Sequence, residues 1–507
     1  MTFPFQHVLP CMNIASDVLP PEKLERIASA KSNVLERIKP TPAEISRING
    51  TTRRVARVVM EILQGRGLSI DYIEPQGSTG LKQTQLAGDS DVDLFIGMNP
   101  SVIAAYKDLP KKELKERLKE LFTTTINDAL VPGLTKALNP QNIMFSYAEH
   151  PYLTIVVDEV KFDIVFCLNL TSAYIEREDI ITAMDRTPLH SKFVKEKLTD
   201  AQKDEVRLLK TFLKAHHVYG DKAAPGQMGF IGYGVEILIH FFGNMENVMV
   251  NFDRLPTYAI DVFGRDTAEL RKVQRFVNDF LIIIDPTDRN RNVGSSTDQR
   301  CYRHALHEIQ SFLDHPGPEH FEISPIPGPT NDDPHIVAIV FDNEKQVHYT
   351  IVRDKLYRLG NLARKELEYE PTGEPRFGRM TFSVLLAKDE SQAALAFHVE
   401  HPSIPAKFKI FGPNSHDDKA RVKVYLEKHP DARLDERGIY FTEKNRNITN
   451  FSDALAKLVK ARFDIKGVTP VKNAHRKIDV SINPERVIGR QAIHVLKNMV
   501  LPYIQSG

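Results

Sequence analysis

Three aspartates stand at alternate positions in GDSDVDLF (88–95), directly before an apolar run. Strand alternation would place Asp91 and Asp93 on one face, while Val92 and Leu94 pack on the other. Two carboxylates that share a face at this spacing repel each other unless a cation lies between them. A charged turn accounts well for Asp89, but it accounts poorly for the other two aspartates. The segment therefore predicts a strand that carries a cation site.

The type of cation follows from the ligands and their spacing. An EF-hand calcium loop opens with the same pattern, but it needs Gly at its sixth position and Glu at its twelfth, where this chain has Leu94 and Pro100. Mg²⁺ prefers oxygen ligands and keeps positions open for substrate phosphates. Upstream, Gly77-Ser78 lies in a turn-prone stretch that can offer backbone N–H groups and a hydroxyl to phosphate. A magnesium site that handles phosphates is the favoured interpretation.

Asp163 is the candidate for a third metal ligand, because it is the lone acid in the apolar strand VKFDIVF (160–166). Burying an unpaired carboxylate costs on the order of several kcal/mol, so this side chain needs a cation or strong donors. A salt bridge to Lys161 or to a neighbouring helix is the alternative.

The chain has 507 residues, too many for one hydrophobic core, so we expect about two to four domains of an α+β protein. Residues 1–40 are expected to be irregular. A helix should begin after Thr41, which precedes Pro42 and lies three residues before Glu44. A segment with six prolines, residues 314–335, marks a domain crossing. Strands are expected at 70–73, 91–96, 154–157, 160–166, 335–341, 380–386 and 394–399, and helices from 200 to 314 and at 417–427.

Charge is spread unevenly along the chain. Residues 401–507 hold 20 Lys and Arg against 11 Asp and Glu, whereas the whole chain has a net charge of only +1. A basic end on an otherwise acidic chain favours a polyanionic partner such as nucleic acid, although a solvated helical surface gives the same composition.

The remaining composition argues for a reduced, cytoplasmic setting. The three cysteines, Cys11, Cys167 and Cys301, are far apart and form neither a disulfide framework nor a zinc motif. The N-terminus shows no secretory signal pattern. The most apolar stretch, Gly229 to Phe242, is short and interrupted by Glu236 and His240, so it should not span a membrane.

Gly-Ser, then Asp-x-Asp, then a later strand Asp resembles the signature of the polymerase-β-like nucleotidyltransferases. Within that superfamily the chain resembles the archaeal-type (class I) CCA-adding enzymes. The resemblance includes further motifs in the family's order: DRTPLH (185–190), VRLLKTFLKAHHVYG (206–220), GFIGY (229–233), IDPTDRNRNV (284–293) and, more weakly, FGPNSHDDKARVKVYLEKH (411–429). Together they span residues 40–440.

The resemblance implies an N-terminal extension (1–40), a nucleotidyltransferase catalytic domain with a mixed sheet (41–198), a helical central domain that binds nucleotide and tRNA (199–322), and an α/β C-terminal tRNA-binding region (323–507). It implies two Mg²⁺ ions on Asp91, Asp93 and Asp163. Nucleotide binding is assigned to Ser78, Lys82, Thr187, His190, Lys210, Tyr219 and Arg291. Arg291 would select the base, and Asp285 and Asp288 would orient its loop. His190 could instead be a buried structural histidine, and Lys210 and Tyr219 an exposed lysine and a capping aromatic residue.

The implied activity is addition of C, C and A to the 3′ end of tRNA from CTP and ATP. The implied partner is tRNA, bound at its acceptor stem and T arm, with no membrane; a homodimer stays open. Candidates for tRNA contact are Lys407, Lys409, Lys419, Arg421 and Lys423. A poly(A)-adding enzyme, a cyclic-nucleotide synthase and an inactive RNA-binding homologue are the alternatives.

Two departures from the family pattern concern the phosphate turn. The family usually has a basic residue three positions after the Ser, where this chain has Leu81, with Lys82 beside it. The spacing from Ser78 to the carboxylates is also one residue longer. Two interpretations stay open: the support of the phosphate turn is altered, or Lys82 replaces the family's basic residue.

Overall fold

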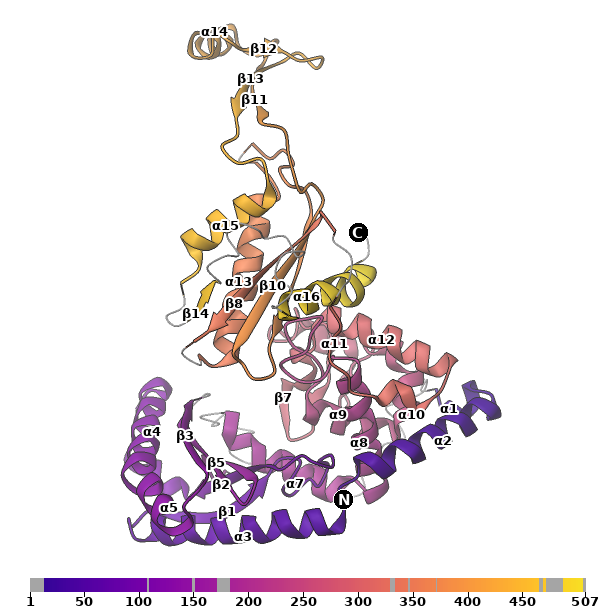
Figure 1. The fold of residues 1–507 in the computed structure, drawn as a ribbon, viewed down its shortest axis with the longest axis vertical. Helices are drawn as coiled ribbons and strands as arrows, with labels where there is room; N and C mark the ends of the chain where they lie inside the picture. Colours follow the sequence, from indigo (N-terminus) through magenta and orange to yellow (C-terminus); the bar gives the residue numbers. More distant parts are fainter. Residues whose placement is uncertain are drawn as a thin grey trace. The chain divides into compact units, whose positions relative to one another are not determined.

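The computed structural model describes residues 13–106, 109–147, 151–170, 183–328, 333–344, 347–370, 372–464, 468–470 and 487–504. These residues form two compact units (Figure 1). The first comprises the chain up to His216 with Phe230–Thr297 and Leu306–Ile323, and the second comprises His217–Gly229, Asp298–Ala305 and the chain from Ser324 onward.

The first unit begins with helices α1 (Ala15–Val18), α2 (Pro21–Ile38) and α3 (Pro42–Gln64). The expectation that residues 1–40 are irregular is wrong over Pro21–Ile38; residues 1–12 lie outside the described part. Pro21 provides the first helical residue, and the apolar Ile27, Ala30 and Val34 share one buried face. Thr41 caps α3 as predicted, since its Oγ1 accepts the Glu44 N–H at 3.2 Å.

A five-stranded sheet forms the core of this unit, in the order β1-β2-β5-β4-β3. Its strands are β1 (Ile70–Gln76), β2 (Asp91–Met98), β3 (Asn142–Tyr147), β4 (Pro151–Val157) and β5 (Val160–Leu168). All neighbours are antiparallel except β2 and β5, which run parallel. The sequence predicted four of these strands and missed the edge strand β3.

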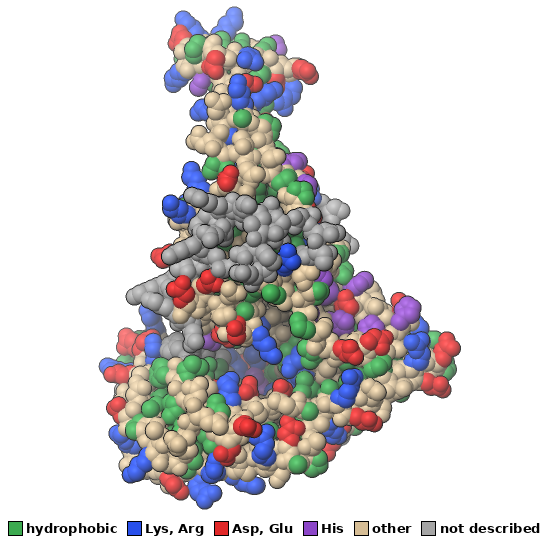
Figure 2. All heavy atoms as spheres, in the orientation of Figure 1, with side chains coloured by type: hydrophobic (Ala, Val, Ile, Leu, Met, Phe, Trp, Pro, Cys, Tyr) green, Lys and Arg blue, Asp and Glu red, His purple; other side chains and the backbone are tan. Residues whose placement is uncertain are grey.

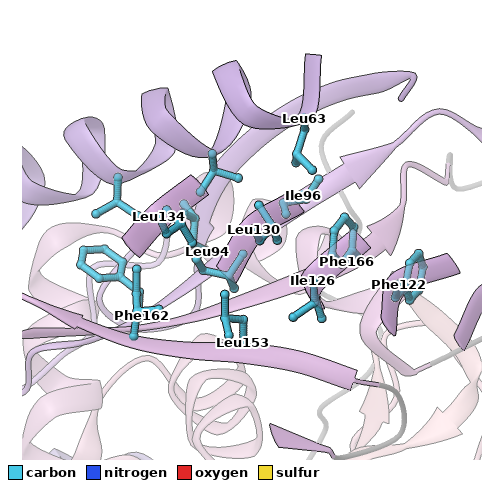
Figure 3. Close-up of a cluster of buried hydrophobic side chains, with 14 of the residues drawn as sticks. Leu63, Leu94, Ile96, Phe122, Ile126, Leu130, Leu134, Leu153, Phe162 and Phe166 are labelled. Carbon is cyan, nitrogen blue, oxygen red and sulfur yellow. The ribbon is translucent and has the colours of Figure 1, made fainter. Parts of the chain in front are cut away.

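Helices cover one face of this sheet. In addition to α3, they are α4 (Lys111–Thr125), a π-helical turn (Ile126–Leu130) and α5 (Val131–Leu138). Leu94, Ile96 and Phe166 point from β2 and β5 into this apolar layer (Figure 3). Because side chains alternate along a strand, the aspartates of β2 and β5 lie on the face opposite this layer.

The rest of the first unit is mostly helical. It contains α7 (Thr187–Lys197), α8 (Asp200–Ala215), α9 (Gly232–Phe242), α10 (Met245–Val250), α11 (Thr267–Lys272) and the C-terminal part of α12 (Gln299–Asp314). The expectation of helix throughout residues 200–314 is wrong over residues 216–231, 255–266 and 273–292. In the last of these stretches β6 (Ile284–Asp285) and β7 (Asp288–Asn292) form a hairpin. Asp285 and Asp288 accept bonds from backbone N–H groups two residues on, which favours turns over helix.

The second unit is built on a four-stranded sheet, β14-β8-β10-β9. The strands are β8 (Ile336–Asn343), β9 (Met380–Leu386), β10 (Gln392–Val399) and β14 (Val468–Pro470). Helices α13 (Tyr349–Leu367) and α15 (Phe451–Arg462) pack on one face, and α16 (Val487–His494) packs on the other. A smaller sheet joins β11 (Lys407–Asn414), β13 (Ile439–Asn445) and β12 (Arg433–Leu434), with α14 (Lys419–Lys428) beside it.

Short helical turns lie between these elements and after the last of them. Turns of 3₁₀ type lie at Pro100–Tyr106, Ala183–Arg186, Phe252–Arg254, Val293–Ser296, Pro318–Phe321 and Leu501–Tyr503, and a second π-helical turn lies at Val495–Val500. Across the described residues, every helix is too short or too polar to cross a bilayer.

Candidate active site

The three predicted metal-binding carboxylates lie together at the beginning of β2 and β5. The parallel register sets Asp93 directly opposite Asp163, and Asp91 opposite Lys161. Asp91 and Asp93 are exposed to solvent, and Asp163 is half-buried. The alternation read from the sequence is confirmed, since Val92 and Leu94 are buried while the two aspartates between and before them are not.

Asp93 is the most perturbed of the three acids. Surrounding protein atoms displace part of its hydration although the residue is exposed, and the negative charges of Asp163 and Asp91 lie nearby. Together these effects raise the pKa of Asp93 to about 6, against the smaller opposing influence of Lys161 and Lys82. A divalent cation would relieve this crowding of like charge.

Lys161 supplies one positive charge to the acidic cluster. Its Nζ lies 3.5 Å from Asp163 Oδ2 and 3.7 Å from Asp91 Oδ2. Burial opposes the charged ammonium, but Asp163 and Asp91 outweigh it and raise the pKa of Lys161. Thr154 Oγ1 also donates to Asp163 Oδ1 at 2.6 Å. The salt bridge considered as the alternative for Asp163 is thus present, on a lysine that is itself 42% exposed.

Gly77 lies directly against the Asp93 carboxylate. A Cβ on Gly77 would lie 2.3 Å from Asp93 Oδ2, so a larger residue would push this carboxylate aside. Its φ of +70° independently favours glycine. Within the described ranges, no three acidic, histidine or cysteine side chains close around one point. The Lys161 ammonium lies between Asp91 and Asp163, so their carboxylates would close around a metal only after this lysine moves aside. The donor set, three carboxylates on adjacent strands, is one that suits Mg²⁺.

The predicted phosphate turn follows β1. Lys82 N donates to Gly77 O at 3.3 Å and Thr84 N donates to Ser78 O at 2.9 Å, which folds residues 77–84 into consecutive turns. Residues 79–90 form no helix, so the anion site that a helix N-terminus would add is not built here. Ser78 is half-buried, and Gly77 N donates to Ser191 Oγ at 3.3 Å.

Lys82 is held by Glu236, the acid that interrupts the apolar stretch of α9. Glu236 of α9 is buried and accepts from Lys82 Nζ at 2.7 Å and from Thr84 Oγ1 at 2.8 Å. Lys210 Nζ donates to Thr84 O at 2.9 Å. A single acid inside GFIGYGVEILIHFF signals such a buried ion pair, because an uncompensated charge there would be costly. Arg207, also unassigned from the sequence, donates to the carbonyls of Gln83 and Gln85.

A second polar cluster is centred on Asp285. Its Oδ1 accepts from Tyr233 OH at 2.9 Å and from the N–H and hydroxyl of Thr287 at 2.8 Å. Its Oδ2 lies 2.8 Å from His190 Nε2 and 2.9 Å from Arg291 Nη1. Burial opposes ionisation, but these donors and charges hold the pKa of Asp285 well below its ordinary value. As predicted, Asp285 orients its loop, and Asp288 does so by accepting from Arg186 Nε at 3.0 Å.

The Asp285 cluster fixes two predicted nucleotide-binding residues. His190 stacks on Tyr233 with ring centroids 4.0 Å apart, and burial lowers its pKa. Arg291 Nη1 lies 3.1 Å from His190 Nε2. The side chain of Arg291 is 32% exposed, so part of the guanidinium fork still faces solvent. Thr187, the first residue of α7, is half-buried.

The charge of Lys82 acts on both the acidic cluster of β2 and β5 and the Asp285 cluster. Its ammonium lies 4.9 Å from the centroid of the Tyr233 ring, and its charge lowers the pKa of both Asp93 and His190. The carboxylates of β2 and β5 and the Arg291–His190 pair are therefore within electrostatic range of one side chain.

The other two predicted nucleotide-binding residues, Lys210 and Tyr219, belong to different compact units. Lys210 is buried in α8, and burial lowers its pKa to about 8 against the influence of Glu236. Helix α8 ends at Ala215 and His217 takes a φ of +57°, so the chain leaves the helix before Tyr219. Tyr219 belongs to the segment grouped with the second unit.

Residues 204–322 match the family description "tRNA nucleotidyltransferase, second domain". The CCA-adding enzyme of Sulfurisphaera tokodaii is 28% identical over 421 residues, which cover 83% of this chain and 89% of that protein. Over most of its length the chain is therefore similar to the archaeal CCA-adding enzymes.

Two further CCA-adding enzymes match over longer and shorter parts of the chain. The CCA-adding enzyme of Pyrobaculum aerophilum is 28% identical over 86% of this chain and 94% of its own length, and that of Thermoplasma volcanium is 31% identical over 58% of each chain. The structure of a cytoplasmic RNA terminal U-transferase covers 60% of this chain at 15% identity with a TM-score of 0.40. The match to a tRNA nucleotidyltransferase domain implies the use of a divalent metal.

Proposed function

We propose that this protein adds C, C and A in turn to the 3′ end of tRNA, using CTP and ATP and releasing pyrophosphate. The observation that carries the proposal is the register of β2 and β5, which aligns Asp93 with Asp163 beside Asp91. Similarity to CCA-adding enzymes over more than four-fifths of the chain supports it.

Asp91, Asp93 and Asp163 would hold two Mg²⁺ ions. Such ions lower the pKa of an attacking hydroxyl and stabilise charge on the transferred and leaving phosphates. The protein's own part is to hold the three carboxylates on adjacent strands and to allow Asp93 its position through the absence of a side chain at Gly77. Thr154 fixes the orientation of the Asp163 carboxylate.

Triphosphate binding is assigned to the turn after β1. Ser78 presents a hydroxyl there, and Lys82 and Lys210 contribute positive charge from behind the turn. Lys82 pairs with Glu236, and Lys210 donates to the Thr84 carbonyl. These contacts hold the turn in place and fix the positions of both ammonium groups. Thr187 and Tyr219 are proposed as further nucleotide contacts.

Base choice is assigned to Arg291 and His190. The Asp285 carboxylate holds both side chains from one side, which leaves a planar donor group at a fixed angle. Such a fork can pair with acceptors that cytosine and adenine present alike, whereas uracil and guanine would present the wrong edge.

The basic C-terminal region would bind the acceptor stem and T arm of tRNA. Figure 2 shows Lys and Arg side chains gathered over the end formed by β11, α14 and β13. The exposed cations there include the five predicted residues, Lys407, Lys409, Lys419, Arg421 and Lys423. Lys409 also lies 4.4 Å from the Phe441 ring centroid. Contacts of this kind to phosphates and 2′-hydroxyls are shape-specific rather than sequence-specific.

A homodimer and a cytoplasmic setting are part of the same proposal. The buried free thiols of Cys167 and Cys301 support a reducing environment.

The test is a product ladder resolved to one nucleotide. Protein, Mg²⁺ and tRNA that lacks its 3′ CCA should give two additions with CTP alone and three with CTP and ATP, and then stop. A long oligo(A) ladder would instead indicate a poly(A)-adding enzyme, and no extension would contradict the proposal. In the same assay, Arg291→Ala should admit UTP; unchanged rejection of UTP would remove Arg291 from base selection.

A further inference from the structure

An exposed aromatic side chain with two arginines lies on the turn at residues 261–265. Phe263 is 43% exposed, although a large apolar side chain gains by burial. The guanidinium carbon of Arg265 lies 5.6 Å from its ring centroid, and that of Arg289 lies 5.9 Å away. None of these residues has a part in the reaction proposed above.

The turn that carries Phe263 is held rigid. Asp261 is almost fully buried and accepts from the backbone N of Arg265 at 2.9 Å, from its Nε at 3.1 Å and from its Nη2 at 3.0 Å. Arg265 Nη2 also donates to the carbonyl of Arg289 at 2.9 Å, which ties the turn to β7. Gly264 takes a φ of +81° at the bend. The exposed ring is therefore presented in a fixed place.

Arg289 completes a patch suited to nucleic acid. It is exposed, and within the described residues it forms no ion pair with an acidic side chain, whereas Arg265 is paired with Asp261. An aromatic ring beside an uncompensated guanidinium offers a stacking surface for a base and a positive charge for the adjoining phosphate. The chemistry of the patch thus matches single-stranded RNA.

The patch is also placed next to the base-selecting residue. Arg289 and Arg291 are two residues apart on β7, so alternation puts both side chains on one face of the strand. Residues two apart on a strand are separated by about 6.5–7 Å, which is close to the reach of one nucleotide along an extended RNA chain.

We propose that Phe263 and Arg289 form a stacking site for the 3′-terminal base of the RNA acceptor, adjacent to the incoming nucleotide at Arg291. The inference rests on the proposed function and names a binding site for the acceptor strand. The ring takes the base, and the guanidinium takes the phosphate of the same nucleotide.

A fluorescent base tests this site. The probe is a tRNA transcript that ends in 2-aminopurine at the nucleotide that accepts the next addition, because stacking quenches its fluorescence. The wild-type protein should quench the probe, and Phe263→Tyr should preserve the effect. Phe263→Ala and Arg289→Gln should lose most of it while total tRNA affinity, measured by filter binding, stays within a few fold. Incorporation at limiting tRNA should fall at least about fivefold, the lower end for loss of one base–aromatic stack.

Phe145→Ala is the matched control, since Phe145 is 44% exposed on β3 and the described structure places no guanidinium over its ring. It should quench like the wild type. Equal quenching by Phe263→Ala and wild type, with both proteins binding tRNA, would overturn the stacking site but leave CCA addition intact. Failure of the wild type to bind or extend tRNA would instead overturn the proposed function itself. Arg289→Gln keeps the test valid if Phe263→Ala is poorly folded, because Arg289 is an exposed side chain.

Discussion

Two acidic centres of the first unit differ in the hydrogen-bond donors that surround their carboxylates. Asp285 is buried, and five donor contacts of 2.8–2.9 Å surround its two oxygens. Asp93 is exposed and lies beside two further carboxylates, and no hydrogen-bond donor to it is found among the described residues. Their pKa values accordingly move in opposite directions from the same ordinary value.

The difference separates a structural carboxylate from one that awaits an ion. A carboxylate with every lone pair taken has no capacity left for a metal, and it fixes whatever donates to it. A carboxylate with free oxygens and like-charged neighbours gains most from a divalent cation supplied by solution. We therefore expect mutations at the two centres to fail in different ways.

The largest expected effect is on catalysis at the first centre. Asp93→Asn keeps the size of the side chain but removes one ligand charge, and incorporation should fall by at least about 10²–10³-fold, as when one electrostatic contributor is lost from a charged transition state. Affinity for tRNA should stay within a few fold. Primer-extension rates and filter binding measure the two quantities; unimpaired incorporation would remove Asp93 from the metal site.

The second centre should respond through stability. Asp285→Ala leaves Arg291 without its buried partner, which typically destabilises a protein by about 3–5 kcal/mol. Thermal denaturation should show a clear fall in melting temperature, and Asp285→Asn, which retains part of the hydrogen bonding, should show a smaller one. By contrast, Asp93→Asn should not lower the melting temperature in metal-free buffer. Equal falls in melting temperature in Asp285→Ala and Asp93→Asn would show that the two centres do not differ in their contribution to stability.

Dependence on pH should follow the raised pKa of Asp93. Because the folded protein holds this proton more tightly than the unfolded chain does, its contribution to stability is present below about pH 4 and is lost as pH rises through about 6. In metal-free buffer the wild type should therefore lose stability relative to Asp93→Asn between pH 5 and pH 7. Mg²⁺ at pH 7 should restore it. A constant difference between the two melting curves would contradict the raised pKa.

The smallest effect is expected at Lys161, the cation already present in the acidic cluster. Lys161→Met removes a competitor for Asp91 and Asp163, so half-maximal activity should need less Mg²⁺. Partly exposed ion pairs are worth about 0.2–1 kcal/mol, which corresponds to a shift of roughly 1.5- to 5-fold. Mg²⁺ titrations of activity and of melting temperature should agree. A greater Mg²⁺ requirement in the variant would show that Lys161 assists metal binding instead.

The sequence predicted the first centre well because its signal is local. Alternating acids before an apolar run determine which strand face they occupy, and Asp163 stands out in its own strand. The register that pairs Asp93 with Asp163 was not predictable from spacing, because it depends on how β2 and β5 align after a crossover of more than sixty residues.

The second centre was only partly predictable. The family resemblance assigned His190 and Arg291, but it gave no role to Tyr233 or Glu236, whose contacts join segments far apart in the chain. The β6–β7 hairpin was missed because its polar turn residues follow no helical or strand period. Helix α2 was not predicted because Pro20-Pro21 is also typical of irregular chain, whereas here Pro20 is the N-cap and Pro21 the first helical residue.

The most direct test is a crystal of the protein grown with Mn²⁺ and a non-hydrolysable CTP analogue, measured at a wavelength where manganese scatters anomalously. The account predicts two anomalous peaks bounded by Asp91, Asp93 and Asp163, with the Lys161 ammonium displaced from its present contacts. Manganese bound elsewhere, with Lys161 still bridging Asp91 and Asp163 beneath a bound nucleotide, would contradict it.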